Sequence, residues 1–572
     1  MAQNKNKENI LNDAFSSIKG YFLYAVLFSA SVNILMITPV IYMLQVYDRV
    51  VSSGSMSTLM MLTLLMMLLL SSAGSFEWVR SRLLVAANVR LESSLRDPLS
   101  KAGFTATLVS GNPNGASQTM SDLLALRQFI TGSGAFAVMD APWTLFYIGI
   151  MFIFHPMFGI AAIISAVIMI LLAVITQKAT SEKLLNANQL TAKANMSFRS
   201  NLKNAEVIHG MGMAANIRRR DNALYDAASD EQAVASTIAG RLSAISKSFR
   251  MISQSILLGM GAYLALNGEI SPGLMIAGSL LLGRALAPID LIVGNWKGFV
   301  EVKSQYNRIR DTLAAFPAEN DRMELPAPNG SLSVEQIILI PPGAQVASLK
   351  GVSFQLDAGD ALGIIGPSAA GKTSLARAIL GVWPLRAGTV RLDGAEITQW
   401  DRDELGPYLG YLPQDIELFD GSIADNICRF SQQDSAKIIE ASQTAGIHEM
   451  ILHLPEGYDT MLNSNAGALS AGQRQRVGLA RAIYGQPRLV ILDEPNSNLD
   501  DQGERDLLAA LQRMKESGHT VIVITHRTSI LSMVDKLLVM KDGDIMKFGE
   551  KDEVLRAINT STAKIAQLQN KA

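Results

Sequence analysis

Long apolar stretches fill the first half of the chain, and short apolar runs separated by polar residues fill the second. A membrane-spanning helix needs roughly 20 mostly apolar residues. Five stretches come near or exceed that length: 21–47, 59–76, 141–177, 251–267 and 273–293. The third is long enough for two helices, and His155-Pro156 falls near its middle, where proline stops a helix. The pattern therefore predicts six membrane spans.

Two long polar stretches, 80–136 and 178–247, separate the second span from the third and the fourth from the fifth. The three other loops are short and hold almost no Lys or Arg. By the positive-inside rule, the long loops and both ends of this half lie in the cytoplasm. The basic residues that carry this bias are Arg80, Arg82, Arg90, Arg96, Lys178, Lys183, Arg218, Arg219 and Arg220.

The third span opens with Asp140-Ala141-Pro142-Trp143. An Asp cap followed by Pro in the first turn is typical of a helix start. The residues before the first span are polar and lack the apolar core and cleavage site of a signal peptide, so we expect that span to remain in the mature protein.

A phosphate-binding loop marks the second half. An apolar run at 361–365 is typical of a buried strand, and 374–380 is typical of a helix. Between them lies the pattern GxxxxGK(S/T), whose backbone N–H groups and following helix N-terminus bind phosphate oxygens. Lys372 can reach the β- and γ-phosphates, and the Thr373 hydroxyl can bind Mg²⁺. The predicted ATP-binding residues here are Gly366, Pro367, Ser368, Ala369, Ala370, Gly371, Lys372, Thr373 and Ser374.

Further chemistry follows at the ends of later apolar runs. The run at 489–492 ends in Asp493, a predicted Mg²⁺ ligand, and Glu494, which could orient and deprotonate the attacking water. Another strand-like run delivers His526 at its tip. A second predicted phosphate-binding helix start holds Ser470, Gly472 and Gln473, and Gln414 lies in a loop between the two phosphate-binding motifs.

Composition supports a membrane half joined to a soluble half. Hydrophobic residues make up 49% of the 572, charged residues only 18%, and the net charge of −1 gives no support for nucleic-acid binding. The only cysteine, Cys428, excludes an intramolecular disulfide and is interpreted as a small core residue. The predicted domains are a tail (1–20), a transmembrane domain (21–310), a linker (311–330) and a nucleotide-binding domain (331–572).

The order of these motifs resembles the ATP-binding cassette (ABC) transporter family. The matching elements are the phosphate loop, Gln414, 469–473, Asp493-Glu494, 497–500 and His526. The resemblance implies an all-α transmembrane domain of exporter type followed by an α/β P-loop nucleotide-binding domain. It also implies that the turning points of the long loops, near 121–130 and 204–213, dock on the nucleotide-binding domains.

The same resemblance implies a homodimer in which two nucleotide-binding domains enclose two ATP molecules. Lys372 of one copy and Ser470 of the other would then contact the same γ-phosphate. Glu494 would be the general base and His526 a contact to the γ-phosphate. Gln414 would bind Mg²⁺ and link it to the membrane half, and Asp500 would signal between the two sites. The implied catalytic residues are therefore Glu494, His526, Lys372 and Gln414, and the implied metal ligands are Thr373, Gln414 and Asp493.

A narrower resemblance is carried by 42–50, 140–143, 283–288 and 493–500. Together these stretches are similar to the type I secretion exporters of proteases, lipases and haemophores in Gram-negative bacteria. That likeness implies a location in the inner membrane and an unfolded polypeptide substrate with a C-terminal secretion signal. The implied partners are a periplasmic adaptor, an outer-membrane channel and the lipid bilayer.

Three positions depart from the ABC pattern. Ala471 replaces the family's second signature glycine, and Pro341 lies where many members place an aromatic ring against adenine. Asn463-Ser464-Asn465 lies where many exporters have an acid. Two alternatives stay open: an exporter of lipids or amphipathic small molecules, and a soluble nucleotide-driven switch in which the apolar stretches form a buried core.

Overall fold

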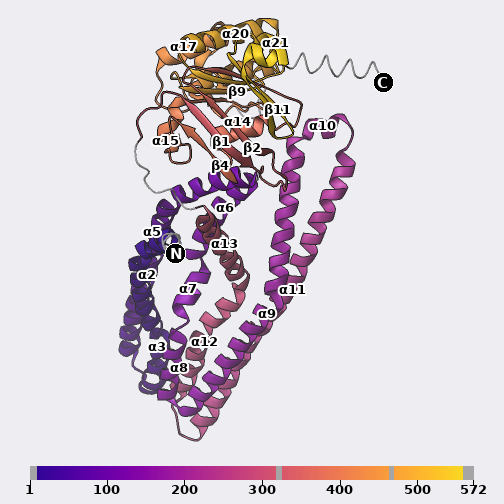
Figure 1. Cartoon of the computed structure of the whole chain (residues 1–572). Helices are drawn as coiled ribbons and strands as arrows, with labels where there is room; N and C mark the ends of the chain where they lie inside the picture. Colours follow the sequence, from indigo (N-terminus) through magenta and orange to yellow (C-terminus); the bar gives the residue numbers. More distant parts are fainter. Residues whose placement is uncertain (1–8, 112, 317–324, 463–468, 558–572) are drawn as a thin grey trace. The chain divides into compact units, whose positions relative to one another are not determined.

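The computed structural model describes residues 9–111, 113–316, 325–462 and 469–557 of the chain (Figure 1). The chain divides into two compact units. The first contains the described residues of 1–107 and 112–318, and the second those of 108–111 and 319–572. The boundary at 318/319 falls inside the stretch 311–330 that was expected to be the linker.

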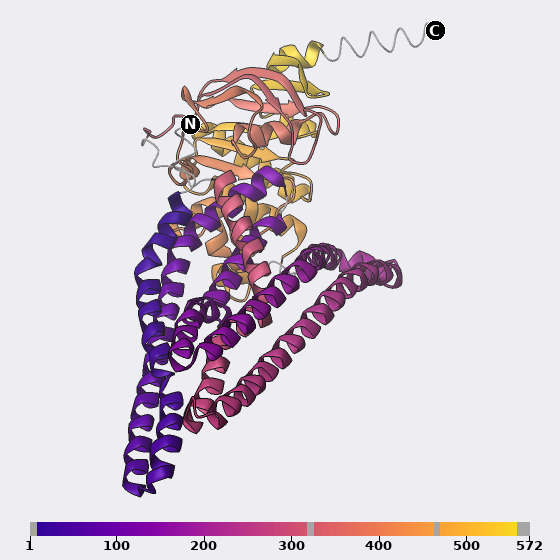
Figure 2. The same cartoon turned by 90° about the horizontal axis from the view of Figure 1, so that it is seen from below.

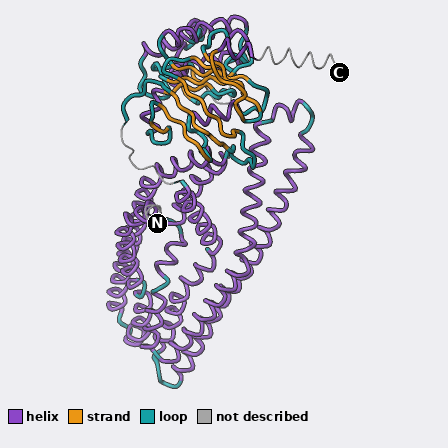
Figure 3. Tube along the Cα trace, viewed as in Figure 1, coloured by secondary structure: helices purple, strands orange, loops and turns teal. Residues whose placement is uncertain are grey.

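Among the described residues, the first unit contains helices joined by turns and no strands, and the strands belong to the second unit (Figure 3). A π-helical turn, Val46–Val50, follows the second of its helices. The helices are α2 (Asn9–Leu35), α3 (Thr38–Gln45), α4 (Val51–Ser53), α5 (Met56–Ser110), α6 (Pro113–Ile130), α7 (Ser133–Asp140), α8 (Trp143–Phe154), α9 (Pro156–Lys203), α10 (Ala205–Gly210), α11 (Ala214–Leu266), α12 (Pro272–Gly294) and α13 (Trp296–Ala315).

The six predicted spans are present in these helices. Five segments are long and apolar enough to cross a membrane: 10–53, α5, α9, α11 and α12. The sixth is the pair α7 and α8, which passes the same test together and bends by 44° at its break. His155 separates α8 from α9 in extended conformation and accepts a hydrogen bond from the Met157 N–H, so the predicted helix break is confirmed.

The helices α9 and α11 run side by side as a long antiparallel pair, visible in both Figure 1 and Figure 2. Small buried residues, Ala187 and Ala194 of α9 and Ala228 and Ala235 of α11, allow the close approach. The seven-residue spacing within each helix is typical of coiled-coil packing. The short helix α10 forms the turn between them, within the predicted turning point 204–213.

The predicted cap at Asp140 is wrong. Asp140 is the last residue of α7, and α8 begins after Pro142 with no side-chain cap. Arg80, one of the basic residues of the long polar stretch 80–136, is only 4% exposed and pairs with Asp140. The contacts that decide this come from helices distant in sequence, which a local pattern does not reveal.

The second unit contains a six-stranded sheet, a four-stranded antiparallel sheet and a two-stranded ribbon. The six-stranded sheet has the order β12-β11-β3-β10-β9-β6, in which β12 alone is antiparallel. The antiparallel sheet has the order β2-β1-β4-β5, and β7 pairs with β8. The strands are β1 (Leu332–Leu339), β2 (Leu349–Leu356), β3 (Ala361–Ile365), β4 (Ala387–Leu392), β5 (Ala395–Glu396), β6 (Leu409–Leu412), β7 (Gly421–Ser422), β8 (Met461–Leu462), β9 (Leu489–Asp493), β10 (Thr520–Ile524), β11 (Lys536–Lys541) and β12 (Asp544–Glu550).

Eight α-helices of this unit accompany the strands among the described residues. The fully buried central strands β9 and β10 pack between apolar helix faces that include Leu375 of α14 and Val477 of α19. The helices are α14 (Lys372–Ile379), α15 (Arg402–Leu405), α16 (Ile423–Ile427), α17 (Ser435–Thr444), α18 (His448–Leu452), α19 (Ala471–Ile483), α20 (Asp501–Glu516) and α21 (Thr528–Leu531).

Candidate nucleotide-binding site

The predicted catalytic residues meet where parallel strands end. The strands β3, β10, β9 and β6 are neighbours in that order and run in one direction. Their carboxyl ends therefore share one edge of the sheet, which is where ligands bind in open α/β folds. The phosphate loop follows β3, His526 follows β10, Asp493 and Glu494 end or follow β9, and Gln414 follows β6.

Backbone geometry shapes the phosphate loop. Gly371 has a φ of +95°, and a Cβ atom there would lie 2.6 Å from the Ser348 carbonyl oxygen. The apex residues Pro367, Ser368 and Ala369 are exposed, and Thr373 and Ser374 lie in the first turn of α14. Ala370, in contrast, is buried. Its carbonyl oxygen accepts a hydrogen bond from the Gly543 N–H at 3.2 Å.

Lys372 folds back over this loop. Its Nζ donates to the carbonyl oxygens of Gly366 at 2.8 Å and Pro367 at 3.0 Å. Burial lowers the pKa of Lys372, and the nearby carboxylates of Glu494 and Asp493 oppose that shift. The Lys372 ammonium group is thus held at the loop by two carbonyl oxygens. It can exchange these hydrogen bonds for bonds to phosphate oxygens when a nucleotide binds.

Asp493 has the properties of a metal ligand. Both of its carboxylate oxygens are buried, and no described donor makes a full hydrogen bond to them. Burial raises the pKa of Asp493, and the nearby Thr373 hydroxyl and the basic residues Arg377 and Lys372 act in the opposite direction. A buried carboxylate without a hydrogen-bond partner is costly unless a cation completes it. The residue set therefore fits Mg²⁺, which prefers oxygen ligands and keeps several waters.

Two polar side chains converge at the Glu494 carboxylate. Gln414 Nε2 donates to Glu494 Oε2 at 3.3 Å, and His526 Nε2 lies 3.8 Å from Glu494 Oε1. The backbone of Glu494 is left-handed, with a φ of +48°, and its N–H donates to the Ile524 carbonyl at 2.9 Å. Such a conformation is unusual for a residue other than glycine and is found where a side chain must be aimed.

The sequence reasoning missed Gln475. This residue of α19 is 2% exposed, and its Nε2 donates to the Glu494 carbonyl at 3.3 Å. Its Oε1 accepts from the Asn498 N–H at 3.0 Å. Gln475 therefore ties the start of α19 to both sides of the turn after β9. No local signal marks Gln475, because Gln473, Arg474 and Arg476 surround it in the same helix.

The other predicted site residues lie at the starts of helices. Ser470 caps α19 in a capping box with Gln473, through Gln473 N–H to Ser470 Oγ at 3.2 Å and Ser470 N–H to Gln473 Oε1 at 2.7 Å. Asp500 caps α20 by accepting from the Gly503 N–H at 2.8 Å. A Cβ atom at Gly472 would lie 2.7 Å from the Asn498 carbonyl oxygen, so glycine fits a close backbone approach.

Ser470 is exposed and, among the described hydrogen bonds, none joins it to the phosphate loop of its own chain. Pro341, the position expected to face adenine, lies in the loop between β1 and β2. The stretch 463–465, where an acid was expected from the family pattern, lies outside the described residues.

Comparison with family models gives two matches. The model described as ABC transporter matches residues 349–497, which include the phosphate loop, Gln414, Ser470 and Glu494. The model described as ABC transporter transmembrane region matches residues 22–287, which contain four of the spans whole and most of the first and the last.

Three relatives have names that describe secretion or translocation of proteins. The type I secretion system ATP-binding protein PrsD of Rhizobium meliloti (strain 1021) is 43% identical over 97% of this chain and 96% of its own length. The cyclolysin secretion/processing ATP-binding protein CyaB of Bordetella pertussis (strain Tohama I) is 27% identical over 92% of this chain and 74% of its length. The alpha-hemolysin translocation ATP-binding protein HlyB of Escherichia coli is 29% identical over 78% of this chain and 64% of its length.

The fold is similar to one solved structure of a bacterial Atm1-family ABC exporter with ATP bound. The TM-score is 0.77 at 20% identity, and the match covers 98% of this chain and 99% of that chain. At this identity the likeness concerns the fold.

Proposed function

The chain belongs to the ABC transporter family, in the group of type I secretion ATP-binding proteins, and from that premise we propose that it exports an unfolded polypeptide with energy from ATP hydrolysis. The observation that carries the proposal is 43% identity to a type I secretion protein over nearly the whole of both chains. The chain is a multi-pass membrane protein, and its ATP-binding cassette is an ATPase coupled to transport.

We assign the steps of hydrolysis to the residues at the strand ends. Lys372 leaves the Gly366 and Pro367 carbonyls and pairs with the phosphates of ATP. Glu494 orients the attacking water and accepts its proton, and His526 contacts the γ-phosphate. Thr373, Asp493 and Gln414 would hold Mg²⁺, which would supply charge neutralisation for the phosphates of ATP.

A second copy of the chain completes each site in this proposal. Ser470 is exposed at a helix start, where N–H groups favour a phosphate, and the described contacts join it to no phosphate-loop residue of its own chain. A symmetric homodimer would place it against the ATP bound by Lys372 of the partner. Asp500 would then pass a signal between the two sites.

The remaining proposals concern the cell. Basic residues in the long loops favour an orientation with the nucleotide-binding domain in the cytoplasm. The likeness to type I secretion proteins favours the inner membrane as the location of the spans. The partners would be a periplasmic adaptor and an outer-membrane channel, as in type I secretion. The substrate would be a protease, a lipase or a similar protein with a C-terminal signal.

The first test compares culture supernatants from cells with the wild-type chain and with Glu494→Gln. Without the general base, ATP should stay bound while hydrolysis falls by about a hundredfold or more. We expect one or a few polypeptides to disappear from the medium and to accumulate inside the cells. Unchanged secreted proteins together with a lost ATPase would contradict a polypeptide substrate and favour export of lipid or small molecules.

A further inference from the structure

One basic residue lies in the middle of a membrane span. The five apolar segments of the sequence together hold only two residues of the types Asp, Glu, Lys and Arg, and these are Arg284 and Asp290 of α12. Arg284 is near the centre of this 23-residue helix, so about 18 Å of helix separate it from the start of the span. Charged side chains within a span are rare and usually face protein or water.

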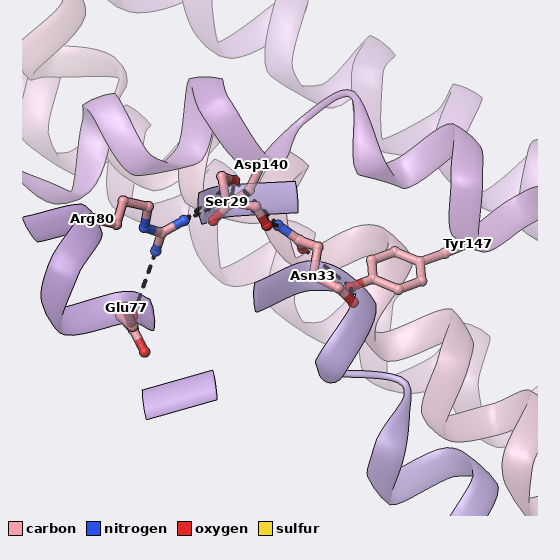
Figure 4. Close-up of polar contacts among 6 residues, drawn as sticks. All are labelled: Ser29, Asn33, Glu77, Arg80, Asp140 and Tyr147. Atoms are coloured by element: carbon pink, nitrogen blue, oxygen red, sulfur yellow. Dashed lines mark hydrogen bonds and ion pairs between the residues drawn. The ribbon is translucent and has the colours of Figure 1, made fainter. Parts of the chain in front are cut away.

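The acidic groups of the spans already have partners in their own chain. Asp290 Oδ1 accepts a hydrogen bond from Ser246 Oγ at 3.1 Å, and Asp290 Oδ2 lies 3.6 Å from Arg250 Nη2. Asp140, at the end of α7, accepts a hydrogen bond from Arg80 Nη1 at 2.9 Å (Figure 4). Each of these two carboxylates therefore has a basic partner on another helix.

Arg284, in contrast, has an exposed side chain, and no described residue forms a hydrogen bond or an ion pair with it. A guanidinium group does not lose its proton in proteins, so the charge is permanent. The adjacent position, Gly283, is covered by α11, because an added Cβ atom there would overlap with the Gln254 side chain. The surface of α12 is thus closed at Gly283 and open at Arg284.

The open surface is a stripe along α12. Leu280 is 41% exposed and Leu291 is 46% exposed, and their spacings of four and seven residues from Arg284 place all three on one face of the helix. Other faces of α12 contact α3, α7, α8, α9 and α11, and α12 is the most buried of the five long apolar helical segments. A lipid-facing stripe would place an unpaired charge in hydrocarbon, which is costly, so the stripe fits a water-filled path.

A second copy of the chain would not supply the missing anion. A symmetric homodimer brings the same residues from both copies, so it adds a second Arg284, whose charge has the same sign. Asp140 and Asp290 are engaged with Arg80 and Arg250 of their own chain. A lipid phosphate is also remote, because the nearer end of α12 is about 15 Å of helix from Arg284. The group that completes Arg284 therefore comes from a molecule inside the path.

We propose that the stripe of Leu280, Arg284 and Leu291 lines the path of the exported polypeptide, and that Arg284 binds carboxylate groups of that polypeptide. A guanidinium can donate two parallel hydrogen bonds to one carboxylate, whereas the leucines contact apolar side chains. The inference rests on the proposed export of a polypeptide and deepens it, because it names a residue and a chemical group through which the passing chain is held.

The first test measures the binding of labelled peptides to the full-length protein in lipid nanodiscs. Two short, unfolded peptides with amidated C-termini differ only in that one carries Glu where the other carries Gln. We expect the wild-type protein to bind the Glu peptide about tenfold more tightly. Arg284→Gln should bind the two peptides alike, and Arg284→Lys, which keeps the charge, should retain part of the preference. The Gln peptide with a free C-terminus shows whether a terminal carboxylate is bound as well.

The matched control is Lys247→Gln, which removes an exposed cation of α11 outside the apolar segments. This variant should keep the preference of the wild-type protein. A wild-type protein that binds all three peptides equally would overturn the proposal. A preference for the Glu peptide that survives Arg284→Gln would also overturn it, because another group would then bind the carboxylates.

The second test measures water access to the stripe and needs no cargo. In a Cys428→Ser background, Arg284→Cys, Leu280→Cys and Leu68→Cys are treated in permeabilised membranes with a charged thiol reagent. Leu68 is 64% exposed on the largely unburied apolar part of α5 and serves as the lipid-facing control. The path predicts that the two α12 cysteines react at least about tenfold faster than the control. Equal reaction of all three would overturn the proposal.

Failure of this inference and failure of the proposed function have different signatures. If Glu494→Gln leaves the secreted proteins unchanged, polypeptide export is rejected, whereas thiol labelling still reports whether α12 faces water. If Glu494→Gln stops secretion but Arg284→Gln secretes and binds the peptides as the wild-type protein does, export stands and the role of Arg284 is rejected.

Discussion

The backbone conformation of Glu494 sets the direction of its side chain. The left-handed φ of +48° turns the chain directly after β9, and the N–H bond to Ile524 fixes that turn to β10. Gln475 holds the other side, since it donates to the Glu494 carbonyl and accepts from the Asn498 N–H. The strained turn is therefore maintained by a neighbouring strand and a buried amide.

We predict that Gln475→Ala lowers the rate of ATP hydrolysis by about tenfold, which corresponds to about 1.4 kcal/mol. The change removes the bonds of Gln475 to the Glu494 carbonyl and the Asn498 N–H and leaves that carbonyl with the Ser497 N–H at 3.2 Å, so Glu494 loses part of its support while ATP still binds. The measurement is kcat against KM for ATP. The control is Gln512→Ala, which removes an exposed amide that bonds Glu516 on α20. A rise in KM with an unchanged kcat would contradict a role in aiming Glu494.

Sequence motifs identify the residues proposed to contact the nucleotide better than the residues that support them. Lys372, Thr373, Asp493 and Glu494 could be named because each stands at a fixed offset from a strand end. Gln475 could not, because a single glutamine in a helix has the same local pattern whether it is exposed or buried. Its partners are 19 and 23 residues away along the chain.

The phosphate loop is an element whose shape depends on glycine at one position. Gly371 combines a left-handed φ with a carbonyl oxygen that would lie 2.6 Å from an added Cβ atom. Gly394, in the turn between β4 and β5, also has a left-handed φ, +82°, but nothing lies within 4 Å of an added Cβ atom. A side chain at Gly371 would meet both backbone strain and a steric clash, whereas one at Gly394 would meet backbone strain alone. Comparing the two positions therefore separates the two effects.

We predict that Gly371→Ala lowers ATP affinity by about tenfold or more and destabilises the nucleotide-binding domain, because the loop must shift away from Ser348. Gly394→Ala should cost only about 1 kcal/mol, and ATP affinity should not change. The measurements are equilibrium binding of ATP by the Glu494→Gln background and thermal unfolding. Equal effects at the two glycines would show that φ strain alone, and not the close carbonyl, governs the loop.

At the level of helices, apolar patterning located the spans but not the extents of the helices. The span expected at 59–76 is part of α5, which continues to Ser110 without a break. Beyond the apolar stretch the helix is amphipathic. It buries Leu91, Leu95 and Leu99 on one side and exposes polar residues on the other. The length of the helix depends on what this second part packs against. The length of the apolar run depends only on the thickness of the membrane.

For the whole molecule, the proposed ATP sites need two copies. Each chain carries one phosphate loop and one Ser470, and the described contacts do not bring them together within a chain. If each site uses Lys372 of one copy and Ser470 of the other, substitutions of both residues in the same chain damage the two different sites of the dimer. A Lys372 substitution in one chain and a Ser470 substitution in the other chain damage the same site.

We therefore predict that Lys372→Ala and Ser470→Arg complement each other. Each variant alone should lack ATP hydrolysis, because both of its sites are damaged. In a mixed dimer one site carries both lesions and the other is intact, so co-expression should restore about a quarter of the wild-type rate. The control is co-expression of two differently tagged Lys372→Ala chains, which should remain inactive. Inactivity of the Lys372→Ala and Ser470→Arg mixture as well would contradict sites shared between copies.

The sequence alone determined the six apolar segments, the strand-loop-helix of the phosphate site and the order of motifs that identified the family. These features are local, since each depends on residue type and spacing over a few tens of residues. Tertiary structure alone decided which distant side chains meet: Gln475 with the turn at Glu494, and Arg80 with Asp140, which had been expected to cap a helix. The physical reason is that burial and pairing depend on neighbours brought together by folding, and the chemistry of a residue does not specify those neighbours.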